Sequence, residues 1–298
     1  MNTQFFYSDT YLVPLSEGHK FPIEKYRMLR DMLLDQGVLS QSNLVESQPV
    51  HLSHLILAHD EKYIDEVLNL TLDQKQAKRV GLPLTKEMVL RARASAGGSI
   101  EAASMALEVG ISGALSSGTH HALSNGGEGF CFFNDFAIIS RIYPKKNVLI
   151  IDLDVHQGNG NGEILKNDSN VTIIDLYCKN NYPLKKQCSL NGQCIGLPSA
   201  VDNEEYLKVL EEALDSTKPD FDLILFQAGV DVLKGDKFGN FNLTLEGIGQ
   251  RDRMVFNYAK NSSIPISFVI GGGYSKPIEK TVEANFQTFK IAKEIYQT

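Results

Sequence analysis

Unbroken apolar runs alternate with helical periodicities along the 298 residues of the chain. The run at 147–153 has no polar alternation, which is typical of a strand that is buried on both faces of a parallel sheet. Other apolar runs that predict strands lie at 5–7, 113–117, 171–176, 223–227 and 264–270. Apolar residues recur at helical spacing over 23–37, 59–72, 86–109, 204–214, 245–260 and 278–296. We therefore predict an α/β fold with a mostly parallel central sheet and helices on both faces.

The segments between these elements do not divide the chain into parts. We find no linker, low-complexity run or internal repeat, and the stretch 177–198 is predicted to be a long loop. Apolar residues make up 43% of the sequence and charged residues 22%, as in an ordinary globular protein. We therefore expect one domain over residues 1–298.

The charge balance and the cysteines bear on partners and compartment. A formal net charge of −7 disfavours nucleic acid as a partner, because phosphate-binding surfaces need clustered Lys and Arg. The same charge would attract a cationic substrate. We find no secretory signal and no apolar run of about 20 residues, so we expect a cytoplasmic protein without a membrane partner. The cysteines lack the spacing of a structural zinc site and do not resemble a disulfide framework; they are Cys131, Cys178, Cys188 and Cys194.

Polar side chains follow four of the predicted strands at the point where each strand ends. Because the carboxyl ends of parallel strands meet at one edge of a sheet, these side chains should converge. Zinc in a catalytic site takes three nitrogen or oxygen ligands and keeps a fourth position open. Asp154, His156 and Asp231 supply such a set. The residues at the four strand ends are His120 and His121, then Asp152, Asp154 and His156, then Asp231, and finally Tyr274 behind three glycines.

Each of these features has a simpler structural interpretation. A pair of histidines in a loop is more often exposed, or hydrogen-bonded in the core, than catalytic, and three glycines are usually a flexible turn. Asp231 and Asp236 could cap helices, and Cys131 has the apolar neighbours of a buried, unreactive thiol. The coincidence of such groups at successive strand ends nevertheless favours a site.

Five motifs in the chain resemble those of one family. In order along the sequence, they are Gly-Thr-His-His-Ala (118–122), Gly-Phe-Cys-Phe-Phe-Asn-Asp (129–135), Ile-Asp-Leu-Asp-Val-His-Gln-Gly-Asn-Gly (151–160), Ala-Gly-Val-Asp-x3-Gly-Asp (228–236) and Gly-Gly-Gly-Tyr (271–274). The chain resembles the zinc-dependent histone deacetylase family, which has an arginase-like fold. Glu-Gly-His-Lys-Phe-Pro (17–22) makes it most similar to the class IV branch and its bacterial relatives.

The resemblance implies zinc-dependent removal of acyl groups, acetyl or longer, from the side-chain amine of lysine in proteins or peptides. The implied zinc ligands are Asp154, His156 and Asp231. In the family's mechanism, a metal-bound water attacks the amide carbonyl.

Further roles follow from the same resemblance. His121 corresponds to the general base, and His120 to its electrostatic partner and a proton donor. Asp152 should accept a hydrogen bond from His120, and Tyr274 should stabilise the oxyanion. The implied substrate-contacting residues are Gly129, Phe130, Tyr182 and Gly272. A monovalent cation, potassium, is implied at Asp152, Asp154, His156, Asp175 and Leu176.

The chain departs from the family pattern at three places. Asn159 stands where many members have aspartate, which favours His121 as a neutral base. Tyr182 stands where phenylalanine is common. No rim aspartate can be placed between Ala77 and Thr85, so a preference for peptide substrates does not follow.

Alternatives remain open. A binuclear manganese hydrolase of the arginase type would need a carboxylate at position 158, which is glycine. An acetylpolyamine or other small-molecule amidohydrolase, and a non-catalytic acyl-lysine binder, are the other candidates. We expect longer acyl chains to be removed better than acetyl, because glycines surround the acyl end; they are Gly118, Gly126, Gly127, Gly129 and Gly271–Gly273.

Overall fold

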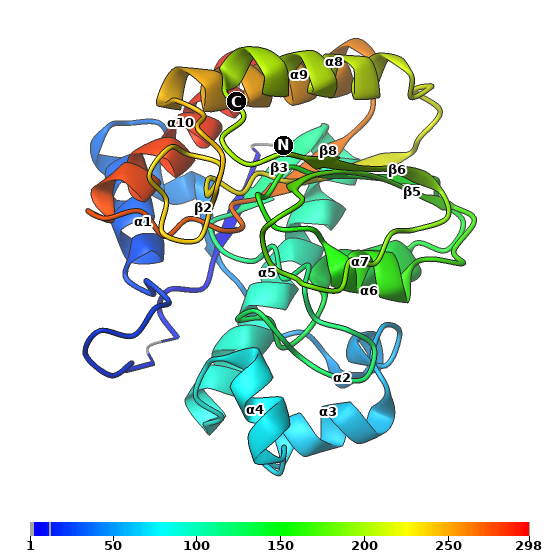
Figure 1. Ribbon diagram of the computed structural model, residues 1–298. Coiled ribbons are helices and arrows are strands. Elements are labelled where there is room, and N and C mark those ends of the chain that lie inside the picture. The colour runs from blue at the N-terminus through cyan, green and yellow to red at the C-terminus, as the bar shows by residue number, and fades with distance from the viewer. Residues whose placement is uncertain (1–2, 12, 298) are drawn as a thin grey trace.

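An eight-stranded sheet forms the centre of the protein, in the order β2-β1-β3-β8-β7-β4-β5-β6. The computed structural model describes residues 3–11 and 13–297 (Figure 1). All strand pairs in the described residues are parallel, as the sequence predicts. The strands are β1 (Phe5–Tyr7), β2 (Leu44–Glu46), β3 (Ile111–Ala114), β4 (Val148–Asp152), β5 (Val171–Cys178), β6 (Gly192–Leu197), β7 (Leu223–Gln227) and β8 (Ile266–Val269).

Helices cover both faces of this sheet, which confirms the predicted α/β architecture. In Figure 1, α8, α9 and α10 lie on one face and α5, α6 and α7 on the other, while α2, α3 and α4 form a group beyond α5. The helices are α1 (Lys25–Asp35), α2 (Leu52–Leu55), α3 (Glu61–Leu68), α4 (Gln74–Val80), α5 (Lys86–Val109), α6 (Asp135–Ile142), α7 (Asn159–Ile164), α8 (Asn203–Asp215), α9 (Leu245–Asn261) and α10 (Glu279–Tyr296), with a 3-10 turn at Gln41–Asn43.

The small residues of α5 let this helix pack closely against its neighbours. A Cβ atom on Gly97 would lie 1.8 Å from the backbone oxygen of Gln48, and one on Gly98 would lie 2.4 Å from the Ser47 hydroxyl. Strands β4 and β7 are buried along their whole length. The central strands are thus packed on both faces of the sheet.

Most of the elements that the sequence did not predict are short or polar; the apolar helix α6 is the exception. Strand β6 contains two glycines and is only half-buried at the sheet edge, so the expected loop 177–198 is wrong in its last part. Helix α4 has the polar sequence Gln-Lys-Gln-Ala-Lys-Arg-Val. Helix α7 begins Asn-Gly-Asn-Gly, which predicts a turn. Strand β6 and helices α4 and α7 have no apolar periodicity to detect.

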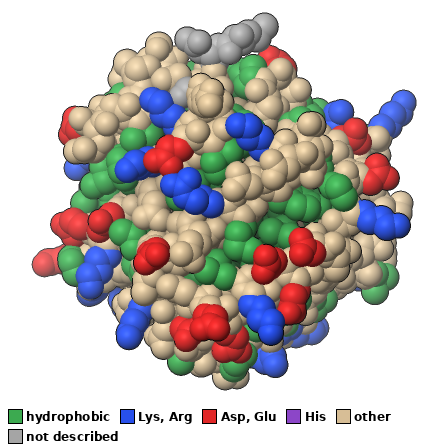
Figure 2. All heavy atoms as spheres, turned by 90° about the horizontal axis from the view of Figure 1, so that it is seen from above, with side chains coloured by type: hydrophobic (Ala, Val, Ile, Leu, Met, Phe, Trp, Pro, Cys, Tyr) green, Lys and Arg blue, Asp and Glu red, His purple; other side chains and the backbone are tan. Residues whose placement is uncertain are grey.

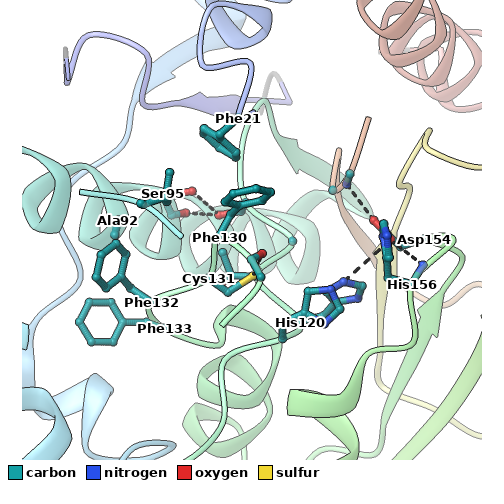
Figure 3. Close-up of a pocket in the computed structure, with 18 of the residues that line it drawn as sticks. Phe21, Ala92, Ser95, His120, Phe130, Cys131, Phe132, Phe133, Asp154 and His156 are labelled. Atoms are coloured by element: carbon teal, nitrogen blue, oxygen red, sulfur yellow. Dashed lines mark hydrogen bonds and ion pairs between the residues drawn. The ribbon is translucent and has the colours of Figure 1, made fainter. Parts of the chain in front are cut away.

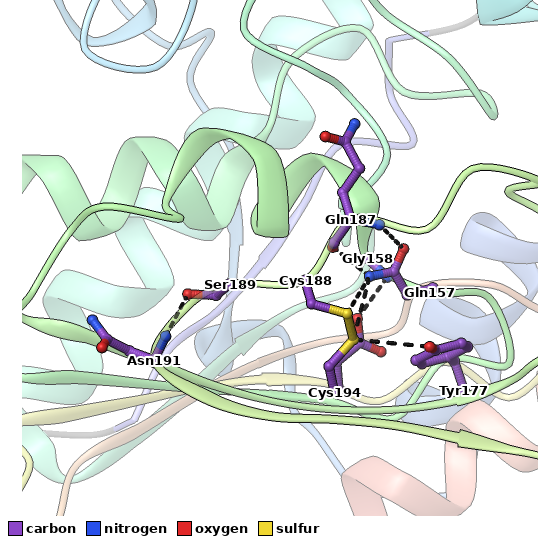
Figure 4. The surroundings of a disulfide bond; sticks show 9 residues. Gln157, Gly158, Tyr177, Gln187, Cys188, Ser189, Asn191 and Cys194 are labelled. Carbon is purple, nitrogen blue, oxygen red and sulfur yellow. Dashed lines mark hydrogen bonds between the residues drawn. A yellow bond between two sulfur atoms is a disulfide. The ribbon is translucent and has the colours of Figure 1, made fainter.

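The cysteine expectation is wrong for one pair. Cys188 and Cys194 form a disulfide, with their Cα atoms 5.8 Å apart (Figure 4). The bond joins the loop after β5 to strand β6, and this return of the chain is invisible in the cysteine spacing alone. Cys131 and Cys178 are free and buried.

Two surface features complete the description. No helix in the described part of the chain is long and apolar enough to cross a membrane. Seen from above the view of Figure 1, acidic and basic side chains are interspersed over the surface (Figure 2).

Candidate active site

Four strands that are adjacent in the sheet, β3, β8, β7 and β4, deliver the predicted polar side chains to one edge. Their exits hold the two histidines, the glycine-rich segment, Asp231 and the Asp154–His156 pair, respectively. The side chains at 120, 121, 154, 156 and 231 are all buried. The predicted convergence is therefore confirmed.

Asp154, His156 and Asp231 form a compact triad that suits a metal ion. One potential ligand atom from each residue lies within 4.8 Å of the others. His156 Nδ1 lies 3.0 Å from Asp154 Oδ1 and 3.0 Å from Asp231 Oδ2. Zinc with bonds of about 2.0–2.2 Å would place tetrahedral ligands about 3.3–3.6 Å apart. The donor set and its spacing thus fit zinc with little adjustment.

The charges of the triad support the same interpretation. Burial lowers the pKa of His156, but the carboxylates of Asp154 and Asp231 outweigh it and raise the pKa to about 10. Burial, together with the charge of Asp154, raises the pKa of Asp231 to about 7. A proton on His156 therefore lies between two carboxylates. A divalent cation would replace that proton at the same place.

Backbone amides fix the orientation of both carboxylates. Gly272 N donates to Asp154 Oδ2 at 2.8 Å, and Val155 N donates to Asp231 Oδ1 at 2.9 Å. A Cβ atom on Gly272 would lie 2.0 Å from Asp231 Oδ2, so only glycine fits at this position. The glycine run thus has a geometric role beyond that of a flexible turn.

His120 is held by Asp152, as expected. Its Nδ1 lies 2.8 Å from Asp152 Oδ2. Burial lowers the pKa of His120, but the carboxylates of Asp152 and Asp154 outweigh it and raise the pKa to about 9. Strand β4 ends at Asp152, and the chain then turns. The carboxylate of Asp152 consequently pairs with His120 and is not one of the three metal-ligand candidates.

His121 has a different partner, which settles its tautomer. Its Nδ1 lies 2.7 Å from Asn159 Oδ1, and Asn159 Nδ2 donates to Glu128 Oε1 at 2.7 Å. Because an amide oxygen only accepts, Nδ1 of His121 must carry a proton and Nε2 keeps its lone pair. Burial lowers the pKa of His121 well below its usual range, and the charges of His120 and His156 act in the same direction.

Glu128 orients this amide and was not predicted from the sequence. Its other oxygen, Oε2, lies 2.6 Å from Arg79 Nη2. Glu128 therefore joins Arg79 to Asn159 and, through Asn159, to His121. The residue lies in the polar segment 123–129, where neither periodicity nor a motif distinguishes it.

The Tyr274 loop is held by two further residues that the sequence analysis did not assign to the site. Asp236 Oδ2 accepts a hydrogen bond from Tyr274 N at 2.6 Å, so Asp236 is a loop anchor and does not cap a helix. Lys25 Nζ, which is buried, donates to Gly271 O at 3.0 Å and to Gly273 O at 3.4 Å. Helix α1 and the loop after β7 thus fix the segment from both sides.

Two cavities meet at the triad. The outer cavity is about 690 Å³, and its lining includes Gly129, Phe130 and Tyr182 together with His121 and His156. The inner cavity is about 60 Å³, and it shares Phe130, His121 and His156 with the outer one (Figure 3). Tyr274 borders both. The side chain of Tyr182 is 41% exposed, and its ring lies 4.9 Å from that of His121. His156 of the triad therefore lies between a wide outer space and a small inner one.

The expected cation residues Asp175 and Leu176 lie on β5, beside Asp152 on β4. Asp175 Oδ2 accepts a hydrogen bond from Gly158 N at 3.0 Å. Within the described residues, the buried Asp175 Oδ1 has no hydrogen-bond partner. A Cβ atom on Gly158 would lie 2.5 Å from Asp152 Oδ2, so position 158 has no room for the extra carboxylate of a binuclear site.

Comparison with known proteins agrees with this geometry. Residues 19–289 match the histone deacetylase domain. An uncharacterized protein of Picosynechococcus sp. is 36% identical over 97% of this chain and 98% of its own length. Histone deacetylase 2 of Arabidopsis thaliana is 30% identical over 93% of this chain and 76% of its own length.

Solved structures show the same fold. The HDA15 HD domain superposes with a TM-score of 0.82 at 20% identity, covering 99% of this chain and 89% of that one. The acetylpolyamine aminohydrolase of Burkholderia pseudomallei superposes with a TM-score of 0.77 at 18% identity, covering 98% and 99%. The matched domain, the relatives and the fold together show that this chain belongs to the zinc-dependent histone deacetylase family.

Proposed function

We propose that this protein is a zinc-dependent hydrolase that removes acyl groups from the side-chain amine of lysine in proteins or peptides. The observation that carries the proposal is the neutral His121, whose Nε2 is left free beside the Asp154–His156–Asp231 triad. A base, two of the three metal-ligand candidates and a tyrosine border the same cavity, and these are the parts that amide hydrolysis requires.

Each side chain has a separate task in this mechanism. A bound zinc ion would polarise the amide carbonyl and lower the pKa of a water molecule. His121 takes the proton of the attacking water at Nε2. His120, which is held protonated by Asp152, donates a proton to the departing lysine nitrogen. Tyr274 donates its hydroxyl hydrogen to the carbonyl oxygen as negative charge develops there.

The outer cavity suits a lysine side chain. Phe130 and Tyr182 present aromatic rings that would remove the lysine methylenes from water. Lys20, Lys78 and Arg79 also line this cavity. Because these cations would repel a polyamine, the rim favours an acyl-lysine peptide over the acetylpolyamine alternative.

Two expectations from the resemblance stay predictions. Closer kinship with the class IV branch is one of them. The other is a potassium ion at Asp152, Asp154, His156, Asp175 and Leu176, which is supported by the buried Asp175 oxygen without a partner in the described residues.

The expected preference for longer acyl chains also stays a prediction, and the inner cavity bears on it. One water molecule occupies about 30 Å³ in the liquid, so a cavity of about 60 Å³ has room for only a short group. An octanoyl or myristoyl chain would require the cavity to open. The kcat/KM values for acetyl-, octanoyl- and myristoyl-lysine on one peptide measure whether it does.

The proposed function is tested with purified protein, with and without zinc. Acyl-lysine peptides and acetylated polyamines are assayed side by side, and metal content is measured on the same sample. We expect one zinc ion per chain and hydrolysis of the peptides that is lost on chelation and restored by zinc. Two tightly bound ions, or activity that survives complete chelation, would contradict the proposal.

A further inference from the structure

Arg91 borders the inner cavity and has no ionic partner in the described residues. It lies on α5, and its side chain is buried. Its Nη2 atom is buried without a hydrogen-bond partner among residues 3–11 and 13–297. No carboxylate oxygen of these residues lies within 4.0 Å of the guanidinium. Such a group stays charged in any protein environment, so burying it without an anion is unfavourable.

The surroundings of Arg91 compensate its charge only in part. The guanidinium lies 4.7 Å from the ring centre of Tyr26 and 5.9 Å from that of Phe21, within cation–π distance. One acidic residue whose charge interacts with that of Arg91 is Asp9, which pairs with Arg30 at 3.0 Å. Burial raises the pKa of Asp9, although Arg30 and Arg91 act in the opposite direction. Asp9 thus forms its ion pair with another arginine, although its Oδ1 atom accepts no hydrogen bond within the described residues.

The position of Arg91 points to a ligand. The inner cavity is lined by Asp154 and His156 as well as by Arg91, Ala92 and Ser95 of α5. In Figure 3, Ala92 and Ser95 lie on the side of the pocket opposite Asp154 and His156. A group that extends inward from a carbonyl held at the triad would therefore approach the α5 wall.

Polar hydroxyls accompany the arginine on that wall. Ser95 Oγ lies 2.9 Å from Ser117 Oγ, and both residues line the cavity. A cavity with one guanidinium and two hydroxyls is poorly suited to a purely aliphatic chain, because a chain without polar atoms leaves the guanidinium unpaired. A terminal carboxylate would supply the missing acceptor.

We infer that Arg91 binds the terminal carboxylate of a short dicarboxylic acyl group, so that the enzyme removes acidic acyl groups such as malonyl or succinyl from lysine. This inference rests on the proposed function. Malonyl and succinyl place their carboxylate one and two methylenes beyond the acyl carbon, so they are among the shortest acyl groups that carry a carboxylate into a cavity of about 60 Å³. Hydrolysis breaks the C–N bond. The hydroxyl of water goes to the acyl carbon and a proton goes to the lysine nitrogen, releasing the dicarboxylate and lysine.

The test compares acyl groups of similar shape and different charge. Acetyl-, malonyl-, succinyl- and 4-methylpentanoyl-lysine are presented on one peptide, where 4-methylpentanoyl is the neutral counterpart of succinyl. The kcat/KM values are measured for the zinc protein, for Arg91→Met and for Lys86→Met. Lys86 lies on the same helix but is exposed, so this variant controls for the loss of one positive charge. Calorimetry on Tyr274→Phe, in which turnover should be slow, measures binding of the same peptides.

We expect kcat/KM for the better of the two acidic substrates to exceed kcat/KM for 4-methylpentanoyl-lysine by about tenfold or more, as for a charge-assisted pair. Arg91→Met should abolish this ratio, while Lys86→Met leaves it unchanged. If the unaltered enzyme hydrolyses the acidic and neutral substrates equally well, or prefers the neutral one, the inference is overturned. This comparison does not depend on whether Arg91→Met folds. If acetyl-lysine is hydrolysed but acidic acyl groups are not preferred, only the Arg91 role is rejected. If no peptide is hydrolysed, the proposed function fails, and equal calorimetric affinities for the acidic and neutral peptides reject the Arg91 role as well.

Discussion

Replacing Asn159 with aspartate should destabilise the protein because of Glu128. The amide nitrogen of Asn159 lies 2.7 Å from Glu128 Oε1, and in Asn159→Asp a carboxylate oxygen takes its place. Two unit charges at this distance repel by about 6 kcal/mol at an effective dielectric constant of about 20. The side chains relieve part of this by moving apart or by taking up a proton. The lost charge-assisted hydrogen bond alone costs about 1.5–3 kcal/mol, so we expect a loss of about 3 kcal/mol.

This loss is large enough to measure by thermal unfolding. At about 2.1 cal/mol/K per residue, the unfolding entropy of 298 residues is about 0.6 kcal/mol/K. A loss of about 3 kcal/mol therefore lowers Tm by about 5 °C at pH 8. Near pH 5 the folded variant shares a proton between the two carboxyl groups, and the unfolded chain releases that proton above about pH 4. Because the folded state then binds more protons, the stability of the variant falls as pH rises, and its deficit should be smaller at pH 5.

A double variant provides the decisive control. In Glu128→Gln/Asn159→Asp, the new amide nitrogen can donate to the carboxylate, while its oxygen still accepts from Arg79. The double variant should therefore recover most of the lost stability, with a coupling of about 3 kcal/mol in the double-mutant cycle. Glu128→Gln alone should cost about 1.5–3 kcal/mol, because its single amide oxygen can accept from only one of Asn159 Nδ2 and Arg79 Nη2. An Asn159→Asp protein as stable as the parent at pH 8, or a double variant no better than the single one, refutes this account of Glu128.

Three further predictions concern the catalytic residues. Tyr274→Phe should lower kcat about 100-fold or more and leave peptide affinity nearly unchanged, because its hydroxyl acts on charge that forms only during the reaction; near-normal turnover would make the tyrosine structural. His121→Ala should reduce turnover more than His120→Ala at matched zinc content and folding, since only a neutral imidazole is a base; the opposite order would reverse the two roles. Lys25→Met should lower both kcat and Tm, because it removes a buried donor from Gly271 O and Gly273 O, and Lys25→Arg should restore part of both; a Met variant with normal kcat would show that the loop does not need this anchor.

The metal-triad candidates could be found from the sequence because two rules act together. An apolar run without alternation predicts a buried strand, and the exit of a parallel strand is where ligands bind. Asp154, His156 and Asp231 follow such strands directly, so proximity in space follows from the fold class alone. The same reasoning reaches Tyr274, which ends the segment after β8.

The supporting residues could not be found in this way, because they come from helices and loops that only the tertiary structure brings to the site. Two of them nevertheless leave a signal. Lys25 is four residues before Leu29, in the buried stripe of α1. Arg91 similarly lies in the buried stripe of α5. A charged residue among apolar positions at helical spacing therefore indicates a buried partner or ligand. Glu128 leaves no such signal.

The order of the strands has a consequence for how the protein folds. Strand β8, the last strand in the sequence, is a central strand between β3 and β7. Until it is synthesised, β2-β1-β3 and β7-β4-β5-β6 have no strand in common. Until then, the two groups of strands either form half-sheets with open edges or stay unfolded. Both states favour aggregation. The strand that joins them also leads to Tyr274, so the sheet and the candidate active site are completed in one late step.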